Sequence, residues 1–224
     1  MSRPIPPAAV DGPEMLHGPL AVSRETQERL AIYVALLLRW QRAQNLVAPS
    51  TLREVWRRHV GDSIQVARLL PEARHWVDLG SGAGFPGLVT AILLMEEEAP
   101  GRVHLVESNQ RKAGFLRAVI RETGCPAEVH AVRIEDLAEG FDAPVEAVSA
   151  RALADLTVLC GYAEPFVARG ATAIFHKGKN FREEITQASH AWDLDLVQTD
   201  SLIDPDSRLL MIRHIRPRRS SGKG

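Results

Sequence analysis

A glycine-rich turn at residues 78–87 carries the residue types best suited to hold a ligand. It reads Asp-Leu-Gly-Ser-Gly-Ala-Gly-Phe-Pro-Gly and follows a short apolar run. Gly80, Gly82 and Gly84 have no side chains, so the backbone can approach a ligand closely and adopt positive φ. Pro86 suits the first turn of a following helix, whose N-terminus offers free N–H groups. We therefore expect a ligand-binding loop between a strand and a helix.

The spacing of this turn narrows the kind of ligand. The dinucleotide pattern G-x-G-x-x-G requires glycine where Phe85 stands, so a pyrophosphate is not indicated. Asp78, ahead of the glycines, can face an ammonium group directly or through water. Glu107, at the end of the next apolar run, can accept both hydroxyls of a ribose, although it could instead cap the following helix. An ammonium group and a ribose together predict S-adenosylmethionine as the cofactor.

Strand-like runs alternate with helical stretches after Pro71, and this alternation must position the turn. The strands are expected at 75–79, 103–106, 128–132, 145–149, 171–176 and 209–214, with helices over 86–97 and 109–122. Such alternation predicts a doubly wound, mostly parallel, Rossmann-like α/β sheet. In these sheets ligands bind outside the carboxyl ends of the strands, where both the glycine turn and Glu107 would lie.

Four segments are expected along the chain. Residues 1–20 are rich in proline and small residues and predict a disordered tail, and residues 21–71 predict a helical N-terminal extension. In that extension one helix begins after Ser23, an N-cap residue, and fades near residue 45. A second helix is expected from residue 50 or 51 to residue 70. The cofactor-binding domain then covers residues 72–215, and a basic tail covers residues 216–224.

Composition limits the class of protein. The net charge of −1 gives no global attraction to nucleic acid, and two cysteines cannot build a disulfide framework. No Cys/His cluster has zinc-ligand spacing, so we expect no metal. The longest apolar run, residues 31–38, is far shorter than the roughly 20 residues that span a bilayer. We expect a cytoplasmic monomer with no membrane partner.

Several separated motifs together resemble one family. Beyond the turn they are Val106-Glu107-Ser108, Arg111-Lys112, Phe115-Leu116, Arg133-Ile134-Glu135, Ser149-Ala150-Arg151-Ala152, and upstream Asn45-Leu46 and Arg58-His59-Val60-Gly61-Asp62-Ser63. In this order they resemble the bacterial small-subunit ribosomal RNA methyltransferases called RsmG or GidB. The resemblance covers roughly residues 28–215.

The resemblance implies a class I methyltransferase that transfers a methyl group from S-adenosylmethionine to N7 of a guanine in 16S ribosomal RNA. The implied target is guanosine 527, near the decoding centre. It also implies a set of residues that contact the cofactor. Within this set Glu107 binds the ribose, at a position where family members often have Asp. The other members of this set are Gly80, Phe85, Ile134, Glu135 and Arg151.

Methylation of guanine N7 needs no base, because the nitrogen already presents a lone pair. We therefore expect no catalytic acid–base pair, with catalysis arising from positioning. Arg151 is the candidate for alignment, through the cofactor carboxylate, an RNA phosphate or guanine O6. The candidate RNA contacts are Arg57 and Arg58 in the helical extension and Lys177 and Lys179 after a late strand. Each could equally be part of a solvated surface.

Two other functions remain open from the sequence. A methyltransferase acting on a small molecule or a protein would share the cofactor domain, and a ribosome-binding module without activity would share the fold. Intact glycines together with Glu107 argue against a lapsed site. The partner is expected to be 16S ribosomal RNA or the small subunit, and the sequence does not choose between naked RNA and an assembling subunit.

Overall fold

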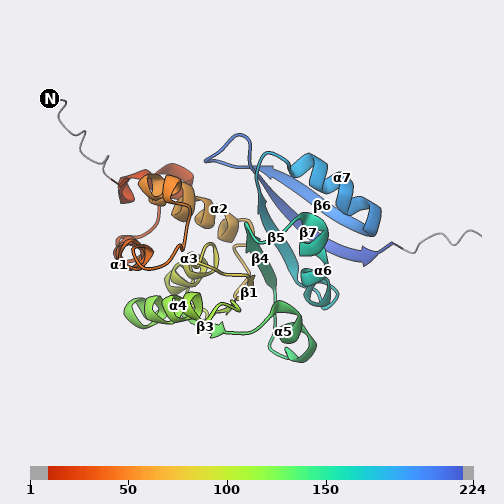
Figure 1. The fold of residues 1–224 in the computed structure, drawn as a ribbon, viewed down its shortest axis with the longest axis horizontal. Coiled ribbons are helices and arrows are strands. Elements are labelled where there is room, and N and C mark those ends of the chain that lie inside the picture. The colour runs from red at the N-terminus through yellow and green to blue at the C-terminus, as the bar shows by residue number, and fades with distance from the viewer. Residues whose placement is uncertain (1–9, 219–224) are drawn as a thin grey trace, which may run out of the picture.

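The computed structural model describes residues 10–218, which form a central sheet with helices on both faces (Figure 1). Seven strands lie in the order β3-β2-β1-β4-β5-β7-β6. Their bounds are β1 His75–Leu79, β2 Arg102–Val106, β3 Ala127–His130, β4 Ala147–Arg151, β5 Thr172–Lys177, β6 Trp192–Asp200 and β7 Arg208–Pro217. Strands β1 to β5 are parallel, and β7 pairs antiparallel with β5 and with β6. The predicted doubly wound, mostly parallel sheet is confirmed.

The helices bury the two faces of the sheet in separate hydrophobic clusters. One cluster includes side chains from α1 (Arg24–Gln41), α2 (Asp62–Arg68), α3 (Gly87–Leu93) and α4 (Gln110–Thr123). The other includes side chains from α5 (Ile134–Gly140), α6 (Leu156–Val167) and α7 (Phe181–Ala191). Figure 1 shows these two groups on opposite sides of the strands. No helix within residues 10–218 is long and apolar enough to cross a membrane.

The sheet reverses its strand order at β1. Strand β1 pairs with β2 on one side and with β4 on the other. The strands that follow β1 therefore extend first to one side of it and then, from β4 on, to the other side. The carboxyl ends of the strands beside such a reversal form the crevice in which doubly wound sheets bind ligands. The glycine turn, which leaves β1 and leads to α3, therefore opens into that crevice.

The N-terminal helices begin as expected and then depart from the prediction. Helix α1 is capped by Ser23, whose hydroxyl accepts a hydrogen bond from the Thr26 amide at 3.1 Å. The predicted single second helix is wrong, because residues 49–68 form three consecutive segments. A 3-10 segment (Pro49–Glu54) leads into a π-helical segment (Val55–Gly61), which continues directly as α2. Isolated π-helical turns often occur at functional sites.

The predicted disordered tail is wrong for residues 10–20. These residues form two short 3-10 turns, and Leu16 and Leu20 are buried in the cluster that contains α1. The Asp11 carboxylate accepts hydrogen bonds from the amides of Trp56 and Arg57 at 3.0 and 2.8 Å, which anchors the segment. Residues 1–9 of the expected tail and residues 219–224 of the expected basic tail lie outside the described residues.

Two elements at the far edge of the sheet were not expected. Helix α7 leads into β6, which forms an antiparallel hairpin with β7. Strand β7 also runs to Pro217, so Arg216 is a strand residue and not part of a tail. Side chains along β6 alternate between half-buried and exposed, as in a strand covered on only one face.

Candidate cofactor and substrate site

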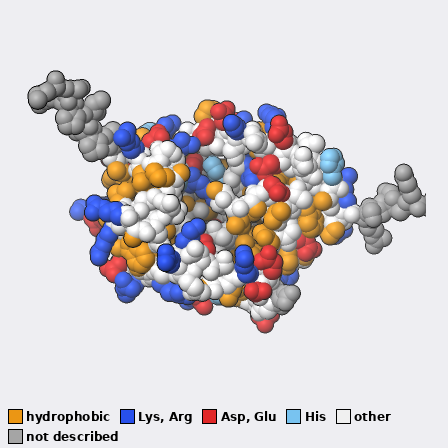
Figure 2. Space-filling model, viewed as in Figure 1, with side chains coloured by type: hydrophobic (Ala, Val, Ile, Leu, Met, Phe, Trp, Pro, Cys, Tyr) orange, Lys and Arg blue, Asp and Glu red, His pale blue; other side chains and the backbone are white. Residues whose placement is uncertain are grey.

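A cavity of about 560 Å³ lies at the carboxyl ends of β1, β2 and β4, beneath the segment that links α1 to α2. Its volume falls within the range of about 300–1,000 Å³ that small ligands and cofactors occupy. The cavity brings together seven of the residues proposed for the cofactor: Gly80, Gly82, Phe85, Glu107, Ile134, Glu135 and Arg151. On the viewed face of the molecule, Lys and Arg side chains gather to the left, over α1 and α4, beside a hollowed centre (Figure 2).

The glycine turn shapes one wall of the cavity with backbone alone. Gly80 and Gly82 have φ values of +62° and +56°, a region that favours glycine. A Cβ added at Gly82 would find only the Gly80 carbonyl oxygen within 4 Å, at 3.7 Å. The space beside Gly82 is therefore open to a ligand, as the sequence predicts.

Gly84 has a different role from the one expected. It does not line the cavity, and a Cβ there would stand 2.9 Å from the Tyr33 hydroxyl oxygen. That hydroxyl donates a hydrogen bond to the carbonyl of Ala83, so α1 packs directly against the turn. The prediction of a cofactor contact at Gly84 is wrong, because the missing side chain makes room for Leu88, whose Cδ1 would overlap the added Cβ, and for Tyr33.

Asp78 also lies away from the cavity. Its carboxylate is 1% exposed, and Oδ1 accepts a hydrogen bond from the Ser149 hydroxyl of β4 at 2.6 Å. The other oxygen, Oδ2, has no hydrogen-bond partner among the described residues. Burial raises the pKa of this carboxyl to about 6. The prediction that Asp78 faces the cofactor ammonium is wrong, because its side chain joins β1 to β4 beneath the turn.

Glu107 lines the cavity and fixes the turn at the same time. Its Oε2 accepts a hydrogen bond from the Gly82 amide at 2.9 Å, and its Oε1 accepts one from the Asn109 amide at 2.7 Å. Helix α4 is capped by Asn109 itself, whose side-chain oxygen accepts from the amides of Arg111 and Lys112. Each carboxylate oxygen has a second lone pair, so Glu107 retains the capacity to accept a ribose hydroxyl.

Aromatic rings pack together beside the cavity. Phe85, from the glycine turn, stacks on His59 and packs at a tilt against Tyr33, each at a centroid distance of 5.0 Å. His59 comes from the π-helical segment and lines the cavity, and its Nε2 lies 2.8 Å from the Thr51 hydroxyl. Burial and then the charge of Arg151 lower the pKa of His59 to about 3. The imidazole is therefore neutral at physiological pH and cannot serve there as a proton donor.

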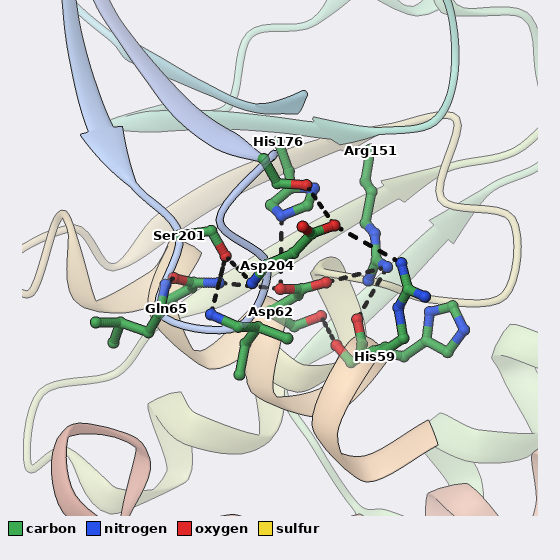
Figure 3. Close-up of polar contacts among 12 residues, drawn as sticks. His59, Asp62, Gln65, Arg151, His176, Ser201 and Asp204 are labelled. Atoms are coloured by element: carbon green, nitrogen blue, oxygen red, sulfur yellow. Dashed lines mark hydrogen bonds and ion pairs between the residues drawn. The ribbon is translucent and has the colours of Figure 1, made fainter. Parts of the chain in front are cut away.

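Arg151 is the last residue of β4 and belongs to a buried polar network (Figure 3). Its Nη2 lies 3.3 Å from Oδ2 of Asp62 and donates to the carbonyl of Arg58 at 2.9 Å. Asp62 Oδ1 lies 3.5 Å from His176 Nε2 on β5 and accepts a hydrogen bond from Gln65 at 3.0 Å. Arg151 Nη1 is buried without a hydrogen-bond partner among the described residues. That nitrogen is itself buried, so a ligand in the cavity would meet the exposed part of the Arg151 side chain, which is 16% of its surface.

The same network continues to the loop between β6 and β7. The Gln65 side chain donates to the Ser201 hydroxyl at 3.1 Å and accepts from the Leu202 amide at 3.0 Å. Arg58 Nη2 lies 3.8 Å from Asp204 Oδ2 on that loop. The polar residues visible in Figure 3 therefore join the helical extension to β4, β5 and the far hairpin.

The four candidate RNA contacts have unequal surroundings. Lys177 is buried, with its ammonium 2.6 Å from Glu184 and donating to the Ala154 carbonyl, so the predicted phosphate contact is wrong. Lys179 is exposed in the following turn. Arg57 and Arg58 have side chains 47% and 43% exposed, each within ion-pair distance of an acidic residue. Arg57, Arg58 and Lys179 remain candidates.

Several cavity residues were given no role in the sequence analysis. Thr51 and Tyr162 line the cavity, as do the basic residues Lys112 and Arg133. Lys112 and Arg133 stand inside motifs that carried the family resemblance, so the sequence held a signal for them. Thr51 and Tyr162 come from the helical extension and α6, whose approach to the sheet has no local signature in the sequence.

Comparison with known proteins identifies the family. The model of the GidB family, described as rRNA small subunit methyltransferase G, matches residues 26–209. The protein of that name from Rhizobium meliloti is 48% identical over 203 residues, covering 89% of this chain and 94% of the relative. Its namesake from Bradyrhizobium is 53% identical over 175 residues, covering 78% of each chain.

The chain belongs to the GidB family. Solved structures agree on the fold. The O-methyltransferase TomG from Streptomyces achromogenes, in complex with SAM, has a TM-score of 0.55 at 15% identity, covering 83% of this chain and 89% of that one. An O-methyltransferase from Bacillus cereus, in complex with SAH, has a TM-score of 0.52 at 15% identity, covering 86% and 92%. The GidB chain thus has the class I methyltransferase fold.

Proposed function

We propose that this GidB-family protein transfers a methyl group from S-adenosylmethionine to N7 of a guanine in 16S ribosomal RNA, with guanosine 527 as the target. The observation that carries the proposal is one cavity that combines an open glycine turn, the Glu107 carboxylate and the Arg151 guanidinium. Family membership supplies the RNA substrate class. We further propose a monomer that acts in the cytoplasm.

The residues around the cavity fit the parts of S-adenosylmethionine. Gly82 leaves open space in which the cofactor can approach the backbone, Gly80 lines the same cavity, and Glu107 offers carboxylate oxygens for the ribose hydroxyls. Ile134 and Glu135, at the start of α5, line the same cavity, and we assign them to the adenine as the family resemblance implies. When bound, the cofactor supplies the electrophilic methyl group; the protein's part is to hold it in line with the acceptor nitrogen.

The chemistry required of the side chains is modest. Guanine N7 attacks the methyl carbon with its own lone pair, so no proton has to be removed before transfer. His59 is neutral, because burial lowers its pKa to about 3, and it places no positive charge beside the acceptor. Arg151 is held by Asp62 and lines the cavity with the exposed 16% of its side chain, which suits a contact with guanine O6 or with the cofactor carboxylate.

The cofactor assignment can be tested by calorimetry with S-adenosylmethionine. Replacing Glu107 by Ala removes the proposed ribose acceptors and should weaken binding about tenfold to a hundredfold, equivalent to about 1.4–2.8 kcal/mol. Replacing Glu107 by Asp keeps a carboxylate and should cost less than the Ala change. Glu122→Ala, on the exposed end of α4, is the control and should bind like the parent. Parental affinity in a folded Glu107→Ala variant would contradict the assignment.

A further inference from the structure

Three side chains with metal-ligating atoms meet on one face of the sheet, at the edge opposite the hairpin. His104 lies on β2, and Glu128 and His130 lie on the edge strand β3. His104 is in register with Glu128, and Val106 with His130. Because side chains alternate along a strand, residues 128 and 130 project to the same face as residue 104. None of the three lines the cofactor cavity.

The atoms of these side chains are already close together. His104 Nδ1 and His130 Nε2 lie 2.9 Å apart, and one ligand atom from each of the three residues falls within 4.8 Å of the others. The ring of Phe141 packs edge-on against both imidazoles, at centroid distances of 4.8 and 5.8 Å. A rigid sheet below and an aromatic ring alongside thus fix the orientation of the two histidines.

We propose that His104, Glu128 and His130 form a zinc-binding site that joins the edge strand β3 to β2. Two imidazole nitrogens and one carboxylate oxygen are donors that zinc accepts, with water in the fourth position.

Zinc binding changes the separation of the two nitrogens only slightly, although both rings must turn so that their lone pairs point at one shared centre. Zinc–nitrogen bonds of about 2.0–2.1 Å in a tetrahedral site place two nitrogens about 3.3 Å apart, against 2.9 Å in the hydrogen-bonded pair. The proton shared by the pair moves to the other nitrogen of its own ring, so no proton is lost. Glu128 has to leave Arg102, from which it lies 3.5 Å away; both side chains are half exposed, so this ion pair is weak.

The sequence did not reveal this site because the proposed zinc ligands lie far apart in the chain. Zinc motifs are recognised by short spacings within one segment, whereas His104 and His130 are brought together by the pairing of two parallel strands. The expectation of no metal rested on spacing alone. The site would act as a structural clamp, because the His130 carbonyl accepts the Glu107 amide at 3.0 Å and so extends the same strand pairing to the cavity rim.

Zinc titration of the full chain by calorimetry tests the proposal. The parent should bind one zinc ion with a dissociation constant of about 10 µM or lower. His130→Ala and Glu128→Gln should each weaken binding at least tenfold. His190→Ala removes an exposed histidine on α7 and should leave the affinity unchanged. Glu128 is exposed and outside the core, so its variant answers the question even if His130→Ala fails to fold.

A second readout separates a built site from scattered surface binding. Zinc at a hundredfold excess over its dissociation constant should raise the midpoint of thermal unfolding of the parent by about 5–10 °C. The Glu128→Gln and His130→Ala variants should show about half of that rise or less at the same concentration. Equal zinc affinity and equal thermal shifts in the parent, Glu128→Gln and His130→Ala proteins would overturn the proposal. Because neither readout involves methyl transfer, failure here leaves the proposed function unaffected.

Discussion

Asp78 is a carboxyl group whose burial has a consequence for stability. Its pKa is raised to about 6 because the side chain is desolvated, with the Ser149 hydroxyl as a partial compensation. In the unfolded chain the same group titrates near pH 3.9. The folded state therefore holds this proton more tightly, and its contribution to stability is complete below about pH 4 and is lost as the pH rises through 6.

An Asp78→Asn variant should reveal this dependence. Asparagine can still accept the Ser149 hydrogen bond but has no charge to desolvate. Between pH 4 and pH 7 the free energy of unfolding of the parent should fall relative to the variant by up to about 3 kcal/mol, from a pKa difference of about two units. Urea unfolding of both proteins at the two pH values measures the change. A difference between parent and variant that is equal at both pH values would show that Asp78 carries no such cost.

At the scale of elements, the π-helical segment and α2 are joined to the sheet through Asp62. This buried carboxylate is the nearest acidic partner of Arg151 on β4 and of His176 on β5. Asp62→Asn leaves the buried arginine without a counter-charge, and removing one partner of a buried pair is costly. The variant should lose about 2–4 kcal/mol of unfolding free energy, measured by urea denaturation.

Asp204 provides the matched control for Asp62. It is the other carboxylate of the network, but its side chain and that of its partner Arg58 are 33% and 43% exposed. Exposed ion pairs contribute about 0–1 kcal/mol, so Asp204→Asn should cost less than about 1 kcal/mol. If the two variants lose equal stability, the burial of Asp62 is not what makes its pair with Arg151 important.

The end of β5 and the turn after it carry two lysines with opposite surroundings. Lys179 is exposed, whereas Lys177 is buried against Glu184. If Lys179 contacts an RNA phosphate, Lys179→Ala should reduce the steepness of the salt dependence of RNA affinity by about 0.7. Lys177→Ala should leave that slope unchanged and lower stability instead. Binding titrations at four salt concentrations, with thermal unfolding, test both; an unchanged slope in Lys179→Ala would remove Lys179 from the RNA interface.

Some elements of this fold could be predicted from the sequence, and others could not. Strand–helix alternation predicted the parallel half of the sheet, and the glycine turn with Glu107 located the cavity. The alternation of Asp193, Leu194, Asp195 and Leu196 is a strand pattern that also indicates β6. The π-helical form of residues 55–61 has no comparable pattern, because it depends on packing between the helical extension and the sheet.

At the site, the direction in which side chains point was the main feature that the sequence did not predict. Asp78 precedes the glycines in sequence, yet its position in β1 turns the carboxylate toward Ser149. Lys177 ends β5 with its ammonium held by Glu184, where the sequence suggested an exposed basic turn. His59 stands in a motif of the family resemblance with no role indicated by the sequence, and only the folded chain brings it onto Phe85. These outcomes depend on contacts between distant segments, which local spacing does not encode.

The whole molecule has a net charge near zero, so its attraction to RNA has to come from local groups. Lys112 and Arg133 line the cavity, and Arg57 and Arg58 lie on the π-helical segment that supplies one of its walls. Basic side chains around a single cavity fit an RNA nucleotide that enters it while neighbouring phosphates are held outside. This arrangement favours a polynucleotide over a small molecule as the methyl acceptor.

The most direct test of this account is methyl transfer to small ribosomal subunits and to free 16S RNA that lack the modification. The protein is incubated with isotopically labelled S-adenosylmethionine, and the labelled nucleotide is then mapped and its methylated atom identified. We predict a single 7-methylguanosine at position 527 of 16S RNA, formed by the parent and reduced at least tenfold in Glu107→Ala. Label on another atom or another RNA, or none on either substrate with a protein that binds the cofactor, would contradict the proposed function.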